Sequence, residues 1–153
     1  MEEITKKILS LVICFVLLAS VLSPVYATEQ SEIIYSEEVI LEDGTIVKDE
    51  IIVTSHARST DKTATRRRTL KDGDTVIGII AFQATFRYDG STVSVVSKSV
   101  TQTDTYEGYS YNQTSFTSSG GTVTLEGKLT KLLIFSTSFS MSLTCDKNGN
   151  LSA

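Results

Sequence analysis

The sequence predicts an all-β protein, an antiparallel β-sandwich or small barrel, on the basis of three observations. Apolar and polar residues alternate with a period of two over much of the chain, which is the pattern of strands buried on one face. Asp-Gly and Gly-Gly pairs separate these runs, as in antiparallel hairpins. Ser and Thr supply 37 of the 126 residues after position 27, which favours half-exposed strands over helices. This length suits a single domain.

The first 27 residues have the pattern of a cleaved export signal. Two lysines precede an apolar run (8–22) of about 15 residues, short of the roughly 20 that span a bilayer. Val25 and Ala27 then supply the small residues of a signal-peptidase site. We therefore expect cleavage between Ala27 and Thr28, a secreted extracellular product, and membrane contact only through the signal.

Charge divides the remaining chain into three parts. The net charge is −7 over residues 28–55, +5 over 56–71 and −2 over the rest. We interpret 28–55 as an acidic β-hairpin segment that turns at Asp43-Gly44, 56–68 as a polar and basic linker, and 69–153 as the β-sandwich domain. The overall charge of −4 argues against a nucleic-acid partner.

Three consecutive arginines, Arg66 to Arg68, end the expected linker. A solvated strand or loop surface is the simplest interpretation of so short a run of charge. A processing site and an anion-binding patch are the alternatives, so the sequence leaves open whether residues 28–68 are retained.

Five strands are expected within the sandwich domain. They are 82–88, 91–103, a strand bearing Tyr109 and Tyr111, 123–130 and 133–145. A change of phase between Val95 and Val96 predicts a β-bulge. Cys145 lies on the apolar side of the last strand and is the only cysteine after the leader, so we expect a buried thiol and no intramolecular disulfide.

The sequence predicts no catalytic, metal or cofactor site, and we expect a protein that is not an enzyme. A single histidine, His56, leaves little for a catalytic triad. Most acidic residues of the domain sit in expected turns, where Asp side chains accept backbone hydrogen bonds. Asp146, Asn148 and Asn150 are spaced like the start of a calcium loop, but the glycine comes too early, at Gly149, and the chain ends before a twelfth-position glutamate. We therefore expect a polar turn at this end of the chain.

The candidate binding surface is a group of tyrosines, Tyr106, Tyr109 and Tyr111. Two residues that are two positions apart on a strand share a face, and aromatic rings on a face can stack on sugars. Cell-envelope polysaccharide or protein is the expected partner class. The alternative, which we favour, is that the rings cap the sandwich core.

Residues 58–153 resemble an uncharacterised group of small secreted β-rich proteins of Gram-positive bacteria. The matching segments are Arg58-Ser59-Thr60, Phe86-Arg87-Tyr88-Asp89-Gly90 and Leu143 to Gly149, with Leu41-Glu42-Asp43-Gly44 upstream. The resemblance implies export and a β-fold, and it transfers no catalytic residue. We therefore expect a secreted, non-enzymatic protein that binds an envelope or extracellular partner; the alternative is a small antagonistic or toxin-like secreted protein.

Overall fold

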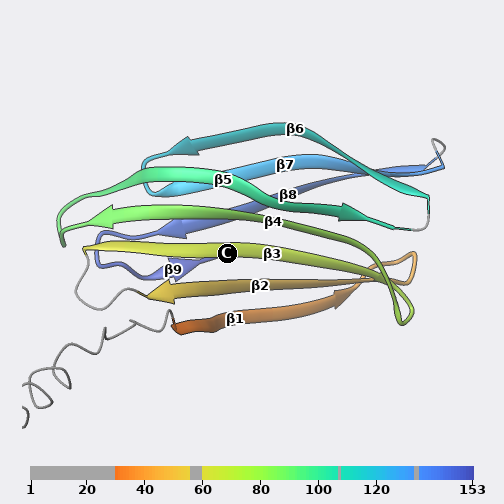
Figure 1. Cartoon of the computed structure of the whole chain (residues 1–153), viewed down its shortest axis with the longest axis horizontal. Coiled ribbons are helices and arrows are strands. Elements are labelled where there is room, and N and C mark those ends of the chain that lie inside the picture. The colour runs from red at the N-terminus through yellow and green to blue at the C-terminus, as the bar shows by residue number, and fades with distance from the viewer. Residues whose placement is uncertain (1–29, 56–59, 107, 133–134) are drawn as a thin grey trace, which may run out of the picture.

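The computed structural model describes residues 30–55, 60–106, 108–132 and 135–153, which form two antiparallel β-sheets packed face to face (Figure 1). The predicted all-β sandwich is therefore confirmed. The expected export signal and its cleavage site between Ala27 and Thr28 lie outside the described residues. Within the described part, no helix is long and apolar enough to cross a membrane.

Each strand pairs with its neighbour in the chain, so both sheets are simple meanders. The first sheet contains β1 (Gln30–Ile40), β2 (Thr45–Ser55), β3 (Asp61–Asp72), β4 (Thr75–Tyr88) and β5 (Val93–Thr105). The second contains β6 (Tyr109–Ser119), β7 (Thr122–Lys131), β8 (Phe135–Cys145) and β9 (Leu151–Ser152). In the face-on view of Figure 1, β8 crosses behind β5 and β4, β6 and β7 lie toward and beyond the β5 edge, and β1 has no long strand behind it.

The core lies between the sheets and comes from alternate positions of their central strands. Because side chains alternate across a strand, one face of each can be apolar and the other polar. The first sheet contributes Ile51, Ile80, Phe82, Ala84 and Phe86, and the second contributes Val123, Leu125, Met141, Leu143 and Cys145. These positions confirm the predicted alternation in residues 82–88, 123–130 and the last strand. The predicted burial of the Cys145 thiol is also confirmed.

The predicted bulge in β5 is present. Thr85 pairs with Ser97 and Phe86 pairs with Val95, which leaves Val96 without a partner in the ladder. Because of this extra residue, the inward positions change from Val93 and Val95 to Val100, and Val96 is 49% exposed.

The predicted acidic hairpin is present as β1 and β2, which turn at Asp43-Gly44, but it is not separate from the sandwich domain. The β1–β2 hairpin is part of the five-stranded sheet, and residues 61–68 of the expected linker belong to β3. The sequence did not predict β3 as a strand buried on one face because its inward positions include the charged residues Arg66 and Arg68. Both arginines pair with Asp49 on β2. The two-residue β9 was also not predicted.

Candidate functional site

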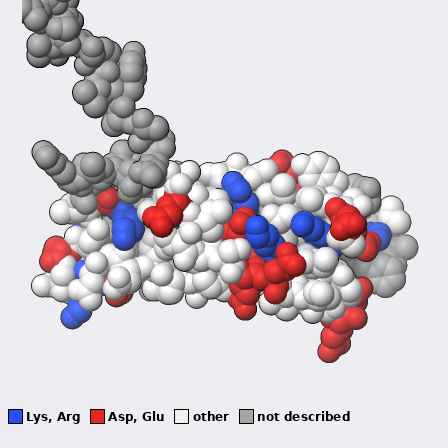
Figure 2. All heavy atoms as spheres, turned by 90° about the horizontal axis from the view of Figure 1, so that it is seen from below, with Lys and Arg blue, Asp and Glu red and all other residues white. Residues whose placement is uncertain are grey.

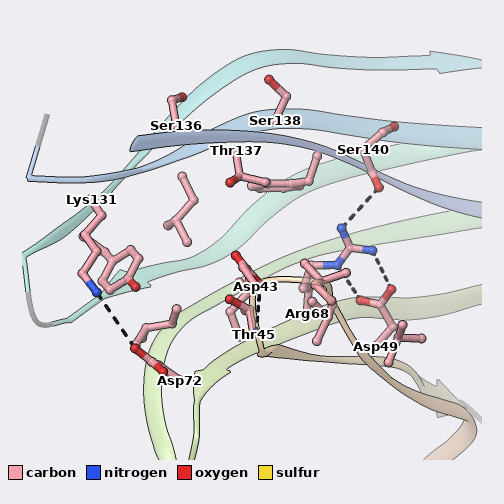
Figure 3. A pocket seen from close by; sticks show the side chains of 18 of the residues that line it. Asp43, Thr45, Asp49, Arg68, Asp72, Lys131, Ser136, Thr137, Ser138 and Ser140 are labelled. Atoms are coloured by element: carbon pink, nitrogen blue, oxygen red, sulfur yellow. Dashed lines mark hydrogen bonds and ion pairs between the residues drawn. The ribbon is translucent and has the colours of Figure 1, made fainter. Parts of the chain in front are cut away.

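A groove with a volume of about 870 Å³ lies between the β1–β2 hairpin and the first half of β8 (Figure 3). Strands of both sheets line it, so its shape depends on the packing of the sandwich. Residues that are apolar, acidic, basic and hydroxyl-bearing all contribute. The groove is therefore amphiphilic, with chemically distinct parts.

The floor of the groove is apolar. Val39, Val47 and Leu70 are cross-strand partners on β1, β2 and β3, so their side chains follow one another along the inner face of the first sheet. Ile77 and Leu129 extend this surface toward the buried core. The floor thus continues the hydrophobic core outward to the edge of the sandwich.

The wall opposite the hairpin is the free edge of β8. One edge of β8 pairs with β7 along its length. Among the described residues, the other edge pairs only with β9, at Thr144 and Cys145. The Cys145 amide donates to the Gly121 carbonyl beside β7, so residues at even positions point their amides and carbonyls away from β7. The outward positions at the groove are Ser136, Ser138 and Ser140.

The side chains of β8 alternate between the groove and the outer face of the second sheet. Figure 3 shows the hydroxyls of Ser136 and Ser138 directed away from the groove and Thr137 directed into it. What these serines present to the groove is therefore their backbone. Only one hydrogen bond to this backbone edge is found in the described part of the groove: Arg68 Nη1 donates to the Ser140 carbonyl at 3.5 Å.

A charged cluster lies at one end of the floor, around Asp49. Arg68 donates Nε and Nη2 to the two Asp49 carboxylate oxygens at 2.7 and 2.6 Å, and Arg66 Nη2 donates at 3.0 Å. The Arg68 guanidinium lies 5.7 Å from the Phe139 ring centroid, and that of Arg66 lies 5.2 Å from the Tyr35 ring. The cluster fixes the position of Arg68 at the edge of β8.

Arg66 is deeper in the sandwich than Arg68 and has incomplete hydrogen bonding. It is 5% exposed, and its Nε and Nη1 have no partner among the described residues. Burial of a guanidinium is costly, so Asp49 is the main group that compensates this charge.

Acidic side chains dominate the rim. The groove lining includes four carboxylates, on Glu37, Asp43, Asp49 and Asp72, and two cations, on Arg68 and Lys131. Seen from the β1 side in Figure 2, acidic side chains gather beside basic ones near the middle of the face. The groove therefore favours a ligand with positive charge.

Individual rim acids are held in defined positions. The Thr45 amide donates to Asp43 Oδ1 at 2.9 Å, which lowers the pKa of the Asp43 carboxyl. Glu37 accepts a hydrogen bond from the Tyr35 hydroxyl, and this bond is the main reason that the pKa of Tyr35 is raised. Asp72 lies 3.9 Å from the Lys131 ammonium.

The three tyrosines of the predicted binding surface do not form one platform. Tyr106 is 46% exposed. Tyr109 lines the groove, with Lys131 5.0 Å above its ring, and Tyr111 stacks on Phe139 at 5.8 Å between centroids. Tyr109 and Tyr111 both pack against the core from the inner face of the second sheet, and burial raises the pKa of Tyr111.

Sequence reasoning did not identify Asp49, Arg68 or the edge of β8 as a site. A usable signal was present, because Asp49 stands in phase with Val47, Ile51 and Val53. A carboxylate at an inward strand position needs a partner, and the arginines of β3 supply it. The open edge of β8 had no comparable signal, because strand order is not visible in local alternation.

The predicted polar turn near the C-terminus is confirmed. Asp146 accepts hydrogen bonds from the amides of Asn148 and Asn150 and from the Asn150 side chain, each at 2.8 Å. These bonds lower the pKa of Asp146, with the Asn150 side chain contributing most. Nowhere in the described ranges do three or more His, Cys, Asp or Glu residues lie close enough together to hold a metal ion.

No protein-family model matches this chain, and no curated protein or solved structure is significantly similar to it. Its function must therefore be inferred from its own residues. The groove combines accessible apolar surface, fixed charges and unpaired strand backbone in one place. Such a combination is suited to holding a ligand.

Proposed function

We propose that this chain is a secreted, non-enzymatic binding protein whose partner, a component of the cell envelope or the extracellular space, occupies the groove between the β1–β2 hairpin and β8. The observation that carries the proposal is the groove itself, at about 870 Å³. Binding sites are typically preformed hollows of about 300 to 1,000 Å³ with apolar walls and a few well-placed polar groups. Secretion is supported by the export-signal pattern of residues 1–27 and by the resemblance to secreted proteins of Gram-positive bacteria.

Exposed apolar side chains at the groove support a binding role. Val39, Leu41 and Leu132 line it and are 46%, 39% and 66% exposed. Large apolar residues that are grouped and exposed on a soluble domain mark binding surfaces more often than isolated ones do. A partner seated in the groove would cover all three.

The proposal is tested by site-specific photo-crosslinking in the secreted chain. A benzoylphenylalanine is placed at Thr137, whose side chain points into the groove, and in a matched variant at Ser97 on β5. Both positions are exposed, but Ser97 does not line the groove. Each variant is irradiated with envelope extract and culture supernatant of the source organism.

We expect a discrete crosslinked product from the Thr137 variant and none from the Ser97 variant. Equal products from both positions, or no product from Thr137 in either sample, would contradict a binding role for the groove. Mass spectrometry of the secreted product should also show an N-terminus at Thr28, because cleavage is expected after Ala27. An N-terminus at Met1 would refute export by this signal.

A further inference from the structure

We propose that the groove binds an extended polypeptide segment, which adds to β8 as an antiparallel strand and alternates apolar with basic residues. The inference rests on the proposed function, since it names the ligand of the same groove. Addition of a strand to an open sheet edge is an established way of binding peptides, in which the backbone supplies affinity and alternate side chains supply specificity.

The first support is a vacant row beside β8. β9 runs antiparallel to β8 and pairs Leu151 with Cys145 and Ser152 with Thr144. Along the same row, the outward amides and carbonyls from Ser142 to Ser136 have no strand partner among the described residues. A strand placed there would extend the second sheet opposite β1 and β2, where Figure 1 shows no long strand. The distance from Ser136 to Ser140 is about 13 Å at roughly 3.3 Å per residue, which accommodates a segment of about five residues.

The second support is the contact between Arg68 and this edge. The Nη1 to Ser140 carbonyl distance of 3.5 Å exceeds the roughly 2.9 Å of a normal N–H to O hydrogen bond. Arg68 is held by Asp49 through Nε and Nη2, so the ion pair does not depend on the Nη1 contact with Ser140. A strand amide would replace this long contact with a shorter and better aligned bond.

The inward side chains of the added strand should be apolar. In the added strand, residues directly opposite Ser136, Ser138 and Ser140 have their side chains on the same outer face of the second sheet as these serines. The side chains of the alternate residues of the added strand therefore face the floor of the groove. That floor is formed by Val39, Val47 and Leu70. An apolar residue at each inward position would remove this surface from water.

The remaining positions should be basic. These positions face the outer side of the second sheet, so the overall charge decides the preference: the net charge of the chain is −4, and carboxylates outnumber cations by four to two in the described lining of the groove. A second copy of this chain carries the same net charge of −4, which makes it a poorer donor of the added strand than a basic polypeptide. The occupant is therefore a segment of a different, basic polypeptide.

A synthetic heptapeptide of alternating lysine and valine, blocked at both ends, is the probe. Its affinity for the secreted chain is measured by fluorescence anisotropy, next to a peptide in which glutamate replaces lysine. We expect the lysine peptide to bind and the glutamate peptide to bind at least about tenfold more weakly. Equal affinity for the two peptides would contradict the basic preference.

Two N-methylated forms of the lysine peptide test strand addition itself. In the antiparallel arrangement the lysine amides donate to β8 and the valine amides point away. N-methylation of the lysines should weaken binding by about tenfold or more, whereas N-methylation of the valines should leave it nearly unchanged. Equal effects of the two modifications, or loss with the valine form alone, would overturn the proposal.

A protein variant provides the reciprocal test. Ser138→Pro removes an amide that faces the groove and makes no bond to β7, so an edge strand should tolerate it. Its affinity for the lysine peptide should fall by about tenfold, while that of the matched variant Ser138→Thr, which keeps the amide, should not change. Thermal unfolding establishes whether each variant is folded. If Ser138→Pro does not fold, the two N-methylated peptides still test strand addition with the unchanged protein.

The two proposals fail in different ways. If Thr137 crosslinks a partner but the lysine peptide does not bind or does not reduce that crosslink, the groove is a binding site and strand addition is wrong. If Thr137 yields no product and no peptide binds, the proposed function is wrong as well.

Discussion

Substitution of Asp49 by Asn should destabilise the fold far more than removal of its buried partner Arg66. Asp49→Asn keeps the size of the side chain but removes the charge that compensates two guanidiniums. The Arg66 side chain is 6% exposed, so its charge would then be buried without a carboxylate. Breaking a buried ion pair from one side costs about 3 to 5 kcal/mol. The lower end applies here, because the Arg68 side chain is 16% exposed and can recover some hydration.

The reverse substitution, Arg66→Met, should cost about 1 kcal/mol or less. Asp49 would keep both hydrogen bonds to Arg68, and the two Arg66 nitrogens without partners would be eliminated. Methionine also fills the space beside the core. The expected difference between the two variants is therefore about 2 to 3 kcal/mol in the free energy of unfolding.

Urea unfolding followed by circular dichroism measures this difference, since the sequence contains no tryptophan for fluorescence. Arg87→Gln is the control, because the Arg87–Asp61 pair lies at the surface with Arg87 60% exposed, and it should change stability little. If Asp49→Asn is no more destabilising than Arg66→Met, Asp49 does not compensate a buried charge and our account of the cluster is refuted.

Three further predictions follow from other parts of the sandwich. The Cys145 thiol is buried, and burial is the main reason that its pKa is raised, so a disulfide reagent at pH 8 should label it slowly until urea unfolds the chain; rapid native labelling would contradict this. Gly127→Ala should lower stability by about 1 to 3 kcal/mol in thermal or urea unfolding, because a Cβ there would lie 2.5 Å from Tyr111 Cε2, whereas the control Gly78→Ala meets only ordinary contacts from 3.5 Å and should be tolerated. The folded-state pKa of Asp146 is lowered, so its hydrogen bonds contribute fully to stability above the unfolded pKa of about 3.9. This stability is lost as the pH falls through the folded-state pKa. The melting temperature of Asp146→Asn should therefore fall less between pH 5 and pH 2 than that of the wild type.

Local alternation predicted the strands whose inward residues are apolar. The inward face of a strand is visible in the sequence at Phe82, Phe86, Val123 and Leu143. The free energy gained by burying an apolar side chain depends on its area and not on which residue lies opposite. The interpretation of β3 was wrong because an inward Arg66 is acceptable only when Asp49 lies diagonally across from it on β2. That condition depends on strand pairing, which is a tertiary property.

The candidate site was predictable to a smaller degree than the fold. Tyr109 was singled out from sequence and does line the groove, although it faces inward. The open edge of β8 depends on β9 being two residues long and on the offset of the two sheets. Neither property can be predicted from the alternation of apolar and polar residues in 135–145.

The division of strands between the sheets has a consequence for cleavage of the chain. Every β-ladder in the described part lies wholly within residues 30–105 or wholly within 109–152, so the Tyr106–Gly108 connection is the covalent link between two complete sheets. Between the halves, Lys62 and Lys98 donate to the carbonyls of Gly149 and Phe116, and core side chains interlock. A protease that cuts this connection would sever no ladder, and the two fragments would stay associated until a denaturant separates their apolar faces.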